Sequence, residues 1–295
     1  MAQEQNNRED LSIQHRTASM VVELYRIVNV YRLYAGRTPP QDWEIIIKDA
    51  LLSPKFKGTA VKNNLVRMIT EVRAFEFVSI LEDLRRLTRD FDQEEIELSA
   101  DINRAIFELA GDVTVRENEA AILEDGLARP IKRANLLIAI RTMQYVGDIN
   151  HIDLLVRYLG RHEYNIANWI LTAIRGIGYR HNTSRANLTF GGDRRDPKAC
   201  LAQFVLPVEY ESFRKSSVYD PIWLKSEIDL LVHYVHSEDI VLRILALLAI
   251  SAIPGNCEYR ENQIGRILSE SKKCDKISEE EAFALRYCAL SVSHK

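Results

Sequence analysis

Residues 129–178 read RPIKRANLLIAIRTMQYVGDINHIDLLVRYLGRHEYNIANWILTAIRGIG, and a pattern within them recurs along the chain. Ala139-Ile140-Arg141 returns thirty-four residues later as Ala173-Ile174-Arg175. The run Ile152–Val156 returns seventy-six residues later as Ile228–Val232. A fixed period of this length is typical of proteins built from stacked pairs of helices. The stretch therefore predicts a helical repeat architecture.

Apolar residues at helical spacing extend this organisation over the rest of the chain. The second helices of the predicted pairs are centred near residues 67, 102, 137, 171, 246 and 286, and the first helices are predicted at 74–89, 117–127, 149–160, 226–236 and 260–272. No segment shows the period-two pattern of a β-strand. The sequence therefore predicts an all-α protein, with the helix pairs stacked into a right-handed α-solenoid.

The predicted organisation has five parts. They are a flexible tail at 1–16, capping helices at 17–58, repeats at 59–178, an insertion at 179–221, and further repeats with a cap at 222–295. Within the capping part, Ala18–Ala35 has helical spacing, and a second helix is expected to start at Thr38 and to bury apolar residues near Trp43.

Composition indicates an ordered protein, because 46% of residues are hydrophobic and 27% are charged. The opening MAQEQNNREDLSIQHR lacks the apolar core of a secretory signal, and no apolar run is long enough for a membrane span. We therefore expect a cytoplasmic protein with no membrane partner. The four cysteines form no C-x-x-C pair, so free, mostly buried thiols are expected, with neither a metal site nor a cofactor.

The insertion 179–221 is rich in Gly, Pro, Asn, Ser and Asp. Such a segment is either a mobile loop or part of a binding face. Its aromatic residues predict that at least its second half packs against something. The following segment, Ile240–Ile253, is apolar on nearly all sides and needs cover on more than one. The insertion or the terminal pair at 260–294 can provide it, and a second molecule is the remaining alternative.

The helix-pair unit, its spacing of thirty-four to forty residues, and the runs LTAIRGIG (171–178) and LLAISAI (247–253) resemble HEAT-type repeats. The resemblance covers residues 59–294 without the insertion. It implies a scaffold that grips another macromolecule along a concave surface. A few bacterial members of that family resemble DNA glycosylases that bind alkylated bases. The resemblance carries no catalytic residue over to this chain.

Charge is segregated along the chain. Residues 90–125 contain twelve acidic and two basic side chains, whereas residues 126–198 contain twelve basic and five acidic ones. Such blocks can steer association with a charged partner. Alternatively, they only solvate the surface or pair between adjacent repeats.

The candidate binding site lies in the basic block, on the polar side of the helix near 171 and at the equivalent position of the repeat before it. Its predicted residues are Arg133, Arg141, Asn165, Asn168, Trp169, Thr172, Arg175, Arg180, His181, Arg185, Arg194 and Arg195. The alternative, purely structural interpretation is that Arg141 and Arg175 complement helix dipoles and that Trp169 belongs to the core.

No phosphate loop, hydrolase elbow or zinc-protease motif is present in the sequence, so catalysis has little support. The first hypothesis is therefore a non-enzymatic scaffold that binds another protein through its concave face and the insertion 179–221, for example a bacterial regulatory or toxin-neutralising (immunity) protein. In this hypothesis either the basic segment 126–198 binds an acidic surface or the acidic segment 90–125 binds a basic one. The second is a nucleic-acid-binding or glycosylase-like protein that uses the basic segment. The net charge of −3 and the acidic block favour the first.

Overall fold

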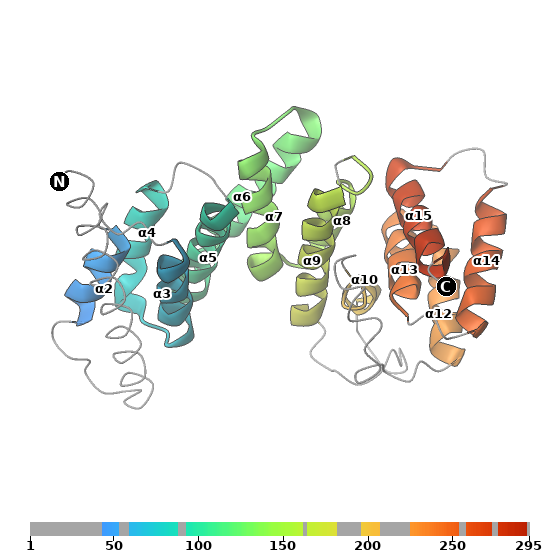
Figure 1. Ribbon diagram of the computed structural model, residues 1–295, viewed down its shortest axis with the longest axis horizontal. Helices are drawn as coiled ribbons and strands as arrows, with labels where there is room; N and C mark the ends of the chain where they lie inside the picture. The colour runs from blue at the N-terminus through green and yellow to red at the C-terminus, as the bar shows by residue number, and fades with distance from the viewer. Residues whose placement is uncertain are drawn as a thin grey trace, which may run out of the picture. The chain divides into compact units, whose positions relative to one another are not determined.

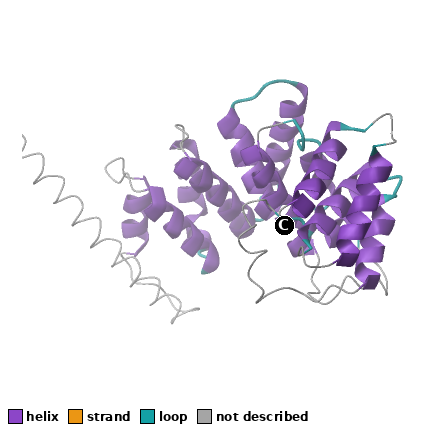
Figure 2. Ribbon diagram, turned by 45° about the vertical axis from the view of Figure 1, so that its right-hand side comes forward, coloured by secondary structure: helices purple, strands orange, loops and turns teal. Residues whose placement is uncertain are grey.

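The computed structural model describes residues 43–52, 59–87, 93–161, 164–181, 196–206, 225–253, 258–272 and 277–293 (Figure 1). Regular structure in these ranges is entirely helical, without a strand (Figure 2). The prediction of an all-α protein is thus confirmed for the described residues. The predicted tail 1–16, the helix at 18–35 and the helix start at Thr38 lie outside them. No described helix is both long and apolar enough to cross a membrane.

The chain divides into two compact units, Met1–Val115 and Arg116–Lys295, and each has a hydrophobic core of its own. The helices of the first unit are α2 (Trp43–Leu52), α3 (Thr59–Glu71), the short 3-10 helix η1 (Phe75–Phe77), α4 (Val78–Leu87) and α5 (Gln93–Ala110). Helix α5 packs against both α3 and α4, and α2 packs against α4. Ile69, Leu81 and Ile102 are fully buried among these helices.

The second unit contains most of the predicted repeats. Its helices are α6 (Thr114–Ala128), α7 (Arg133–Val146), α8 (Asn150–Val156), α9 (Tyr164–His181), α10 (Pro197–Ala202), α12 (Lys225–Val235), α13 (Ile240–Ala252), α14 (Glu258–Ser271) and α15 (Glu279–Ser293). Helix α7 packs along α9, and α13 packs against both α12 and α15. Apart from α10, each of these helices covers a segment that the sequence predicts as helical.

Helix α10 belongs to the second half of the predicted insertion and packs between α9 and α13. It begins at Pro197, because the Asp196 carboxylate accepts a 2.8 Å hydrogen bond from the backbone amide of Lys198 and proline is tolerated in a first helical turn. Gly178 allows the close approach to α9, since a Cβ there would lie 2.9 Å from the Cβ of Ala202. Residues 196–206 of the insertion therefore pack against α9 and α13, whereas residues 207–221, with the aromatic residues Tyr210, Phe213 and Tyr219 on which the packing prediction also depends, lie outside the described residues.

Lys198 of α10 forms ion pairs with residues of two other helices. Its Nζ atom lies 2.8 Å from both carboxylate oxygens of Asp153 in α8, and 3.8 Å from Oδ2 of Asp239, the residue that caps α13. Partial burial lowers the pKa of Lys198, but the carboxylates of Asp153, Asp239 and Asp196 outweigh it and the pKa is raised overall. The ion pairs thus hold the lysine in its charged form between α8, α10 and α13.

Helix α13 is buried on nearly all sides, including every residue from Ile244 to Ala252. Helices α8, α10, α12 and α15 surround it. Both predicted covers, the insertion and the terminal helix pair, are therefore present. Arg260 of α14 caps the C-terminal end of α13. It is buried and donates hydrogen bonds of 3.1 Å to the carbonyl oxygens of Ile250 and Ser251.

Candidate binding surface on α7 and α9

The α7–α9 contact sets the position of the predicted binding residues. The two helices bury Ile140 and Met143 of α7 against Ile174 and Ile177 of α9 in the core of the second unit. Gly176 allows a close approach, because a Cβ at this position would lie 2.7 Å from Cγ of Gln144. The core side of α9 follows the predicted period. Of its predicted polar stripe, Asn165 is exposed and Thr172 and Arg175 are partly exposed, but Asn168 is buried and does not belong to the surface.

Arg141 is stacked against aromatic rings from both helices. Its guanidinium carbon lies 5.3 Å from the ring centroid of Tyr145 and 5.4 Å from that of Trp169. The same side chain donates a hydrogen bond from Nη1 to Oε1 of Gln144. Among the described residues, no carboxylate forms an ion pair with Arg141. The guanidinium is therefore held in place by ring faces and an amide, and its charge is not cancelled by an acid of the described chain.

Arg175 has a similar arrangement on α9, one predicted repeat later. Its guanidinium carbon lies 5.2 Å from the ring centroid of Tyr179, and its Nη2 atom donates a 3.1 Å hydrogen bond to the tyrosine hydroxyl. Tyr179 is 51% exposed, so the pair lies at the surface. Thr172, one turn earlier, donates its hydroxyl hydrogen to the backbone carbonyl of Asn168 at 2.8 Å.

The two tyrosines and Gln144 are not among the binding residues predicted from the sequence. A signal for the tyrosines was present, because Arg141 is followed by Tyr145 and Arg175 by Tyr179, so an Arg-x3-Tyr pattern recurs on the same thirty-four-residue period. Residues four apart face each other on a helix. The repeat therefore places one arginine–tyrosine pair on each of the two packed helices.

Trp169 lies at the boundary between the core of the second unit and its surface. It is only partly buried, it packs against the core of the second unit, and its ring also receives Arg141. The remaining described candidates differ in exposure: Arg133, Asn165, Arg180 and His181 are exposed, and Asn168 is 4% exposed. Arg185, Arg194 and Arg195 lie outside the described residues.

Arg180 caps the C-terminal end of α7. It donates hydrogen bonds to the carbonyl oxygens of Gln144 and Gly147, the latter at 2.6 Å from Nη2. These carbonyls have no partner within the helix, and a cation is favoured beside them by the helix dipole. Arg180 therefore joins α9 to α7 structurally, beside the surface that carries Arg141 and Arg175.

Charges elsewhere in the basic block are partly paired. Lys198 contacts Asp153, and Arg129 Nη2 lies 2.7 Å from Asp125 Oδ2. The Arg129–Asp125 pair joins the two blocks, as the alternative interpretation predicts, whereas Asp153 and Lys198 both belong to the basic block. Arg141 is different, since ring faces hold it instead.

No protein-family model matches the chain, and no curated protein matches it. The function of the α7–α9 surface must therefore be inferred from its chemistry. A guanidinium that lies against a ring keeps N–H groups at its edge, and these can bind a carboxylate or phosphate with two parallel hydrogen bonds. No group of three or more acidic, histidine or cysteine side chains in the described ranges is arranged to hold a metal ion.

Proposed function

We propose that the protein is a non-enzymatic scaffold of HEAT-like stacked helix pairs that binds an acidic surface of another protein. Within each unit, the helices that are predicted as second members of successive pairs pack against each other, and this packing supports the proposed stacking. These are α3 with α5 in the first unit, and α7 with α9 and α13 with α15 in the second. In such an arrangement the second helices form one layer and present equivalent positions side by side.

The observation that carries the proposal is Arg141 between Tyr145 and Trp169. A partly exposed arginine that is held by aromatic rings is already ordered before binding, so little side-chain entropy is lost when an anion arrives. Arginine, tyrosine and tryptophan are also the residues that most often dominate the energy of protein–protein contacts. A regulatory or toxin-neutralising role would follow if the bound acidic surface is the partner's functional site.

A nucleic-acid ligand is the second candidate, including an alkylated-base glycosylase-like role for the 126–198 segment. The same rings favour it, because exposed aromatic side chains next to arginines can stack on unpaired bases. The net charge of −3 opposes it, since a long polyanion would be repelled by the remainder of the surface. The two candidates differ in ligand and in salt dependence, so one set of variants can separate them.

The test uses Arg141→Glu combined with Arg175→Glu. Wild type and this double variant are immobilised, and proteins captured from an extract of the native host are identified by mass spectrometry. Each captured protein is then purified and its dissociation constant measured. We expect an acidic partner whose binding weakens by at least tenfold in the double variant, because each substitution turns an attraction into a repulsion. A single-stranded oligonucleotide is titrated in parallel at low and high salt.

The matched control is Arg157→Glu combined with Arg286→Glu. Both arginines are exposed in the second unit, and the total change in charge is the same. Retention of the partner by the control and its loss by the Arg141/Arg175 variant support the proposal. Equal losses in both variants would contradict it. Salt-sensitive oligonucleotide binding that only the Arg141/Arg175 variant abolishes would establish the second candidate in its place.

A further inference from the structure

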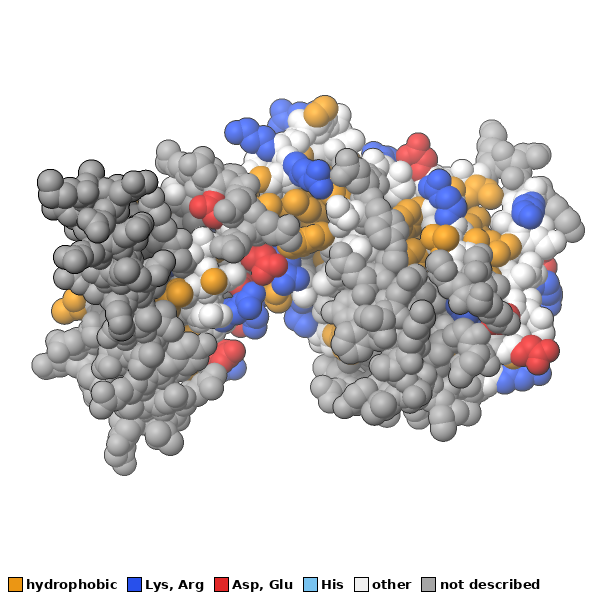
Figure 3. Space-filling view, in the orientation of Figure 1, with side chains coloured by type: hydrophobic (Ala, Val, Ile, Leu, Met, Phe, Trp, Pro, Cys, Tyr) orange, Lys and Arg blue, Asp and Glu red, His pale blue; other side chains and the backbone are white. Residues whose placement is uncertain are grey.

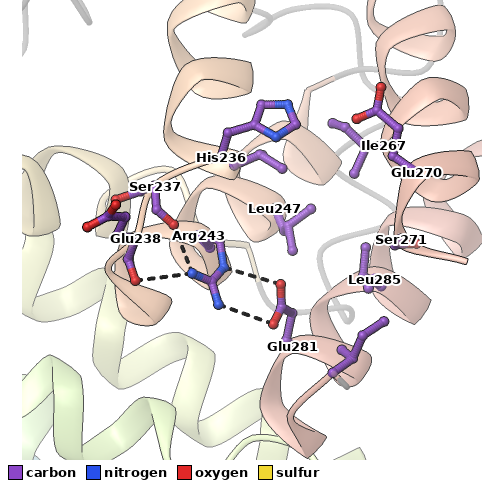
Figure 4. Close-up of a pocket in the computed structure, with 12 residues that line it drawn as sticks. His236, Ser237, Glu238, Arg243, Leu247, Ile267, Glu270, Ser271, Glu281 and Leu285 are labelled. Atoms are coloured by element: carbon purple, nitrogen blue, oxygen red, sulfur yellow. Dashed lines mark hydrogen bonds and ion pairs between the residues drawn. The ribbon is translucent and has the colours of Figure 1, made fainter. Parts of the chain in front are cut away.

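The arginines of the second unit differ in how many of their N–H groups the fold uses. Arg243 lines a cavity of about 450 Å³ formed by the α12–α13 turn, α13, α14 and the start of α15 (Figure 4). Its Nε and Nη2 atoms lie 3.3 and 3.4 Å from the two carboxylate oxygens of Glu281. Its Nη1 atom donates to the carbonyl oxygens of Ser237 and Glu238, so four of its five N–H groups are used within the fold.

Arg260 of α14 is also used within the fold. Its Nε atom donates to the carbonyl oxygen of Ile250, and its Nη2 atom donates to the carbonyl oxygen of Ser251 and, at 2.6 Å, to Oγ of Ser291. On the face shown in Figure 3, hydrophobic side chains gather over α13 to α15, with charged side chains around them. Arg243 and Arg260 stabilise this group of helices, and neither has an Nε–Nη2 edge left for a ligand.

Arg141 on α7 keeps this edge open. Its Nη1 atom donates to Gln144, but its Nε and Nη2 atoms form no hydrogen bond with any described residue, and neither atom is buried. In Arg175, by contrast, the Nε atom is buried. Of these two arginines of the α7–α9 surface, Arg141 is therefore the one whose Nε–Nη2 edge can receive a ligand.

Gln144 determines which edge of Arg141 remains open. A guanidinium can only donate, so the amide of Gln144 turns its oxygen toward Nη1. The Nε–Nη2 edge lies opposite Nη1 in the planar group and is directed away from Gln144. Gln144 is itself held by α9, because its carbonyl oxygen accepts a hydrogen bond from Arg180 and a Cβ at Gly176 would lie 2.7 Å from its Cγ. The side chain that orients Arg141 therefore has little room to move.

The open edge carries two parallel N–H groups, and their spacing matches the two oxygens of a carboxylate. We propose that Gln144 positions this edge of Arg141 for one carboxylate group of the partner, from an aspartate or glutamate side chain. Gln144 is a positioning residue, since it acts through Arg141. One guanidinium also matches the single charge of a carboxylate, whereas a phosphate group carries about −1.5 to −2 at neutral pH. This inference rests on the proposed function, because it names the group that the α7–α9 surface binds.

Three peptides test which group is bound, with the full chain at neutral pH and low salt. The first consists of repeated Glu-Ser-Gly units, the second has Gln in place of Glu, and the third has phosphoserine at half as many positions, so that its total charge is similar to that of the first. Binding is measured by isothermal titration calorimetry. The Nε–H signal of Arg141, assigned by its loss in Arg141→Lys, is followed by NMR. We expect the Glu peptide to bind most tightly and to shift this signal.

Gln144→Met tests the positioning role, because it retains the side-chain volume and removes the amide that accepts from Arg141. We expect the Glu peptide to bind about twofold to tenfold more weakly, the range expected for the loss of one hydrogen bond. In an Arg141→Ala background the same change should have no effect, because Gln144 then has no guanidinium to position. A purely structural role of Gln144 would weaken binding in both backgrounds.

Gln144→Glu tests the same edge through charge. The new carboxylate would pair with Arg141, so we expect the Glu peptide to bind about tenfold more weakly or worse. The matched control is Asn262→Asp, which adds the same charge at an exposed position of α14 and should change the affinity by less than about twofold. Circular dichroism checks that each variant is folded, and the two Gln144 variants test the role independently.

The outcomes separate this inference from the proposed function. If Arg141→Ala weakens binding of the Glu peptide but both Gln144 variants bind it like wild type, the inference is overturned and the proposed function stands. Tighter binding of the phosphoserine peptide, or equal losses in Gln144→Glu and Asn262→Asp, would also overturn the inference alone. If a partner captured from the native host binds Arg141→Ala as tightly as wild type, both fail.

Discussion

Asp148 gives the second unit an acid-sensitive contact. Its Oδ1 atom lies 2.6 Å from Nδ1 of His151 and accepts a 3.1 Å hydrogen bond from the amide of Asn150, and its Oδ2 atom lies 3.4 Å from Nη1 of Arg116. Partial burial raises the pKa of Asp148, but these partners outweigh it and the pKa is lowered overall. The charged carboxylate is therefore favoured in the folded state more than in the unfolded chain.

This lowered pKa predicts the direction of a pH effect on stability. A carboxyl group whose folded pKa is depressed contributes its full stabilisation above the unfolded pKa, about 3.9, and loses it as the pH falls through the folded pKa. Urea unfolding at pH 5 should therefore show wild type more stable than Asp148→Asn, and the difference should shrink at pH 2.5. Glu124→Gln, at an exposed position, serves as control. A difference that is the same at both pH values would contradict the assignment.

The sequence predicts which positions carry the candidate binding residues, but it does not predict which side chains these residues contact. The thirty-four-residue offset pairs Arg141 with Arg175, and the structure places these arginines on two helices that pack together. That Arg141 lies against Trp169, or that Arg180 closes α7, depends on which turn of α9 meets which turn of α7. This register is set by Gly176 and the buried side chains, and no local pattern encodes it.

At the scale of elements, α10 is a short helix whose position depends on Lys198. A helix of 6 residues is too short to be stable by itself, so its order must come from packing and from the ion pairs to Asp153 and Asp239. Lys198→Gln removes the charge and retains most of the side-chain volume. We expect amide hydrogen exchange in α10 to accelerate by about tenfold, with α14 unchanged.

The matched control for α10 is Lys225→Gln, since Lys225 is exposed on α12. Exchange is followed by mass spectrometry on peptides that contain residues 196–206. Unchanged protection of these amides in Lys198→Gln would mean that the apolar contacts of Leu201 and Val205 alone order the segment. Acceleration spread over all helices of the second unit would mean that the lysine supports the whole unit.

Helix positions were predictable because amphipathic spacing is strong in this chain. The predicted segments at 117–127, 226–236 and 260–272 correspond to α6, α12 and α14 within a few residues at each end. Helix α10 was not predicted, because Pro197–Ala202 is too short to show a helical period. The predicted burial of Ile240–Ile253 on several sides is confirmed, since such a composition leaves no polar face for solvent.

At the scale of the molecule, the two units have separate cores, so a destabilising substitution in one core should lower the stability of that unit alone. Ile69 of α3 and Leu248 of α13 are both fully buried, one in each core. Ile69→Ala and Leu248→Ala should each destabilise their own unit by about 2–5 kcal/mol, the usual effect of such a truncation in a core. Hydrogen exchange should therefore accelerate in α3 and α5 for the first variant, and in α13 and α15 for the second.

Leu290→Ala, at a position 48% exposed on α15, is the control and should change the free energy of unfolding by less than about 0.5 kcal/mol. Acceleration in both units by either core variant would show that the chain unfolds as one cooperative body. The sequence did not predict a division at Val115, because the repeat period runs through this position without a break in composition.

The place of α10 limits how the chain can be shortened for engineering. Loops inserted into repeat proteins are often removed without harm, because the flanking units then close on each other. Here residues 196–206 stand between α9 and α13 and cover apolar side chains of both. A deletion that included them would expose those side chains and yield an aggregation-prone product, so a minimal version of the protein has to retain this segment.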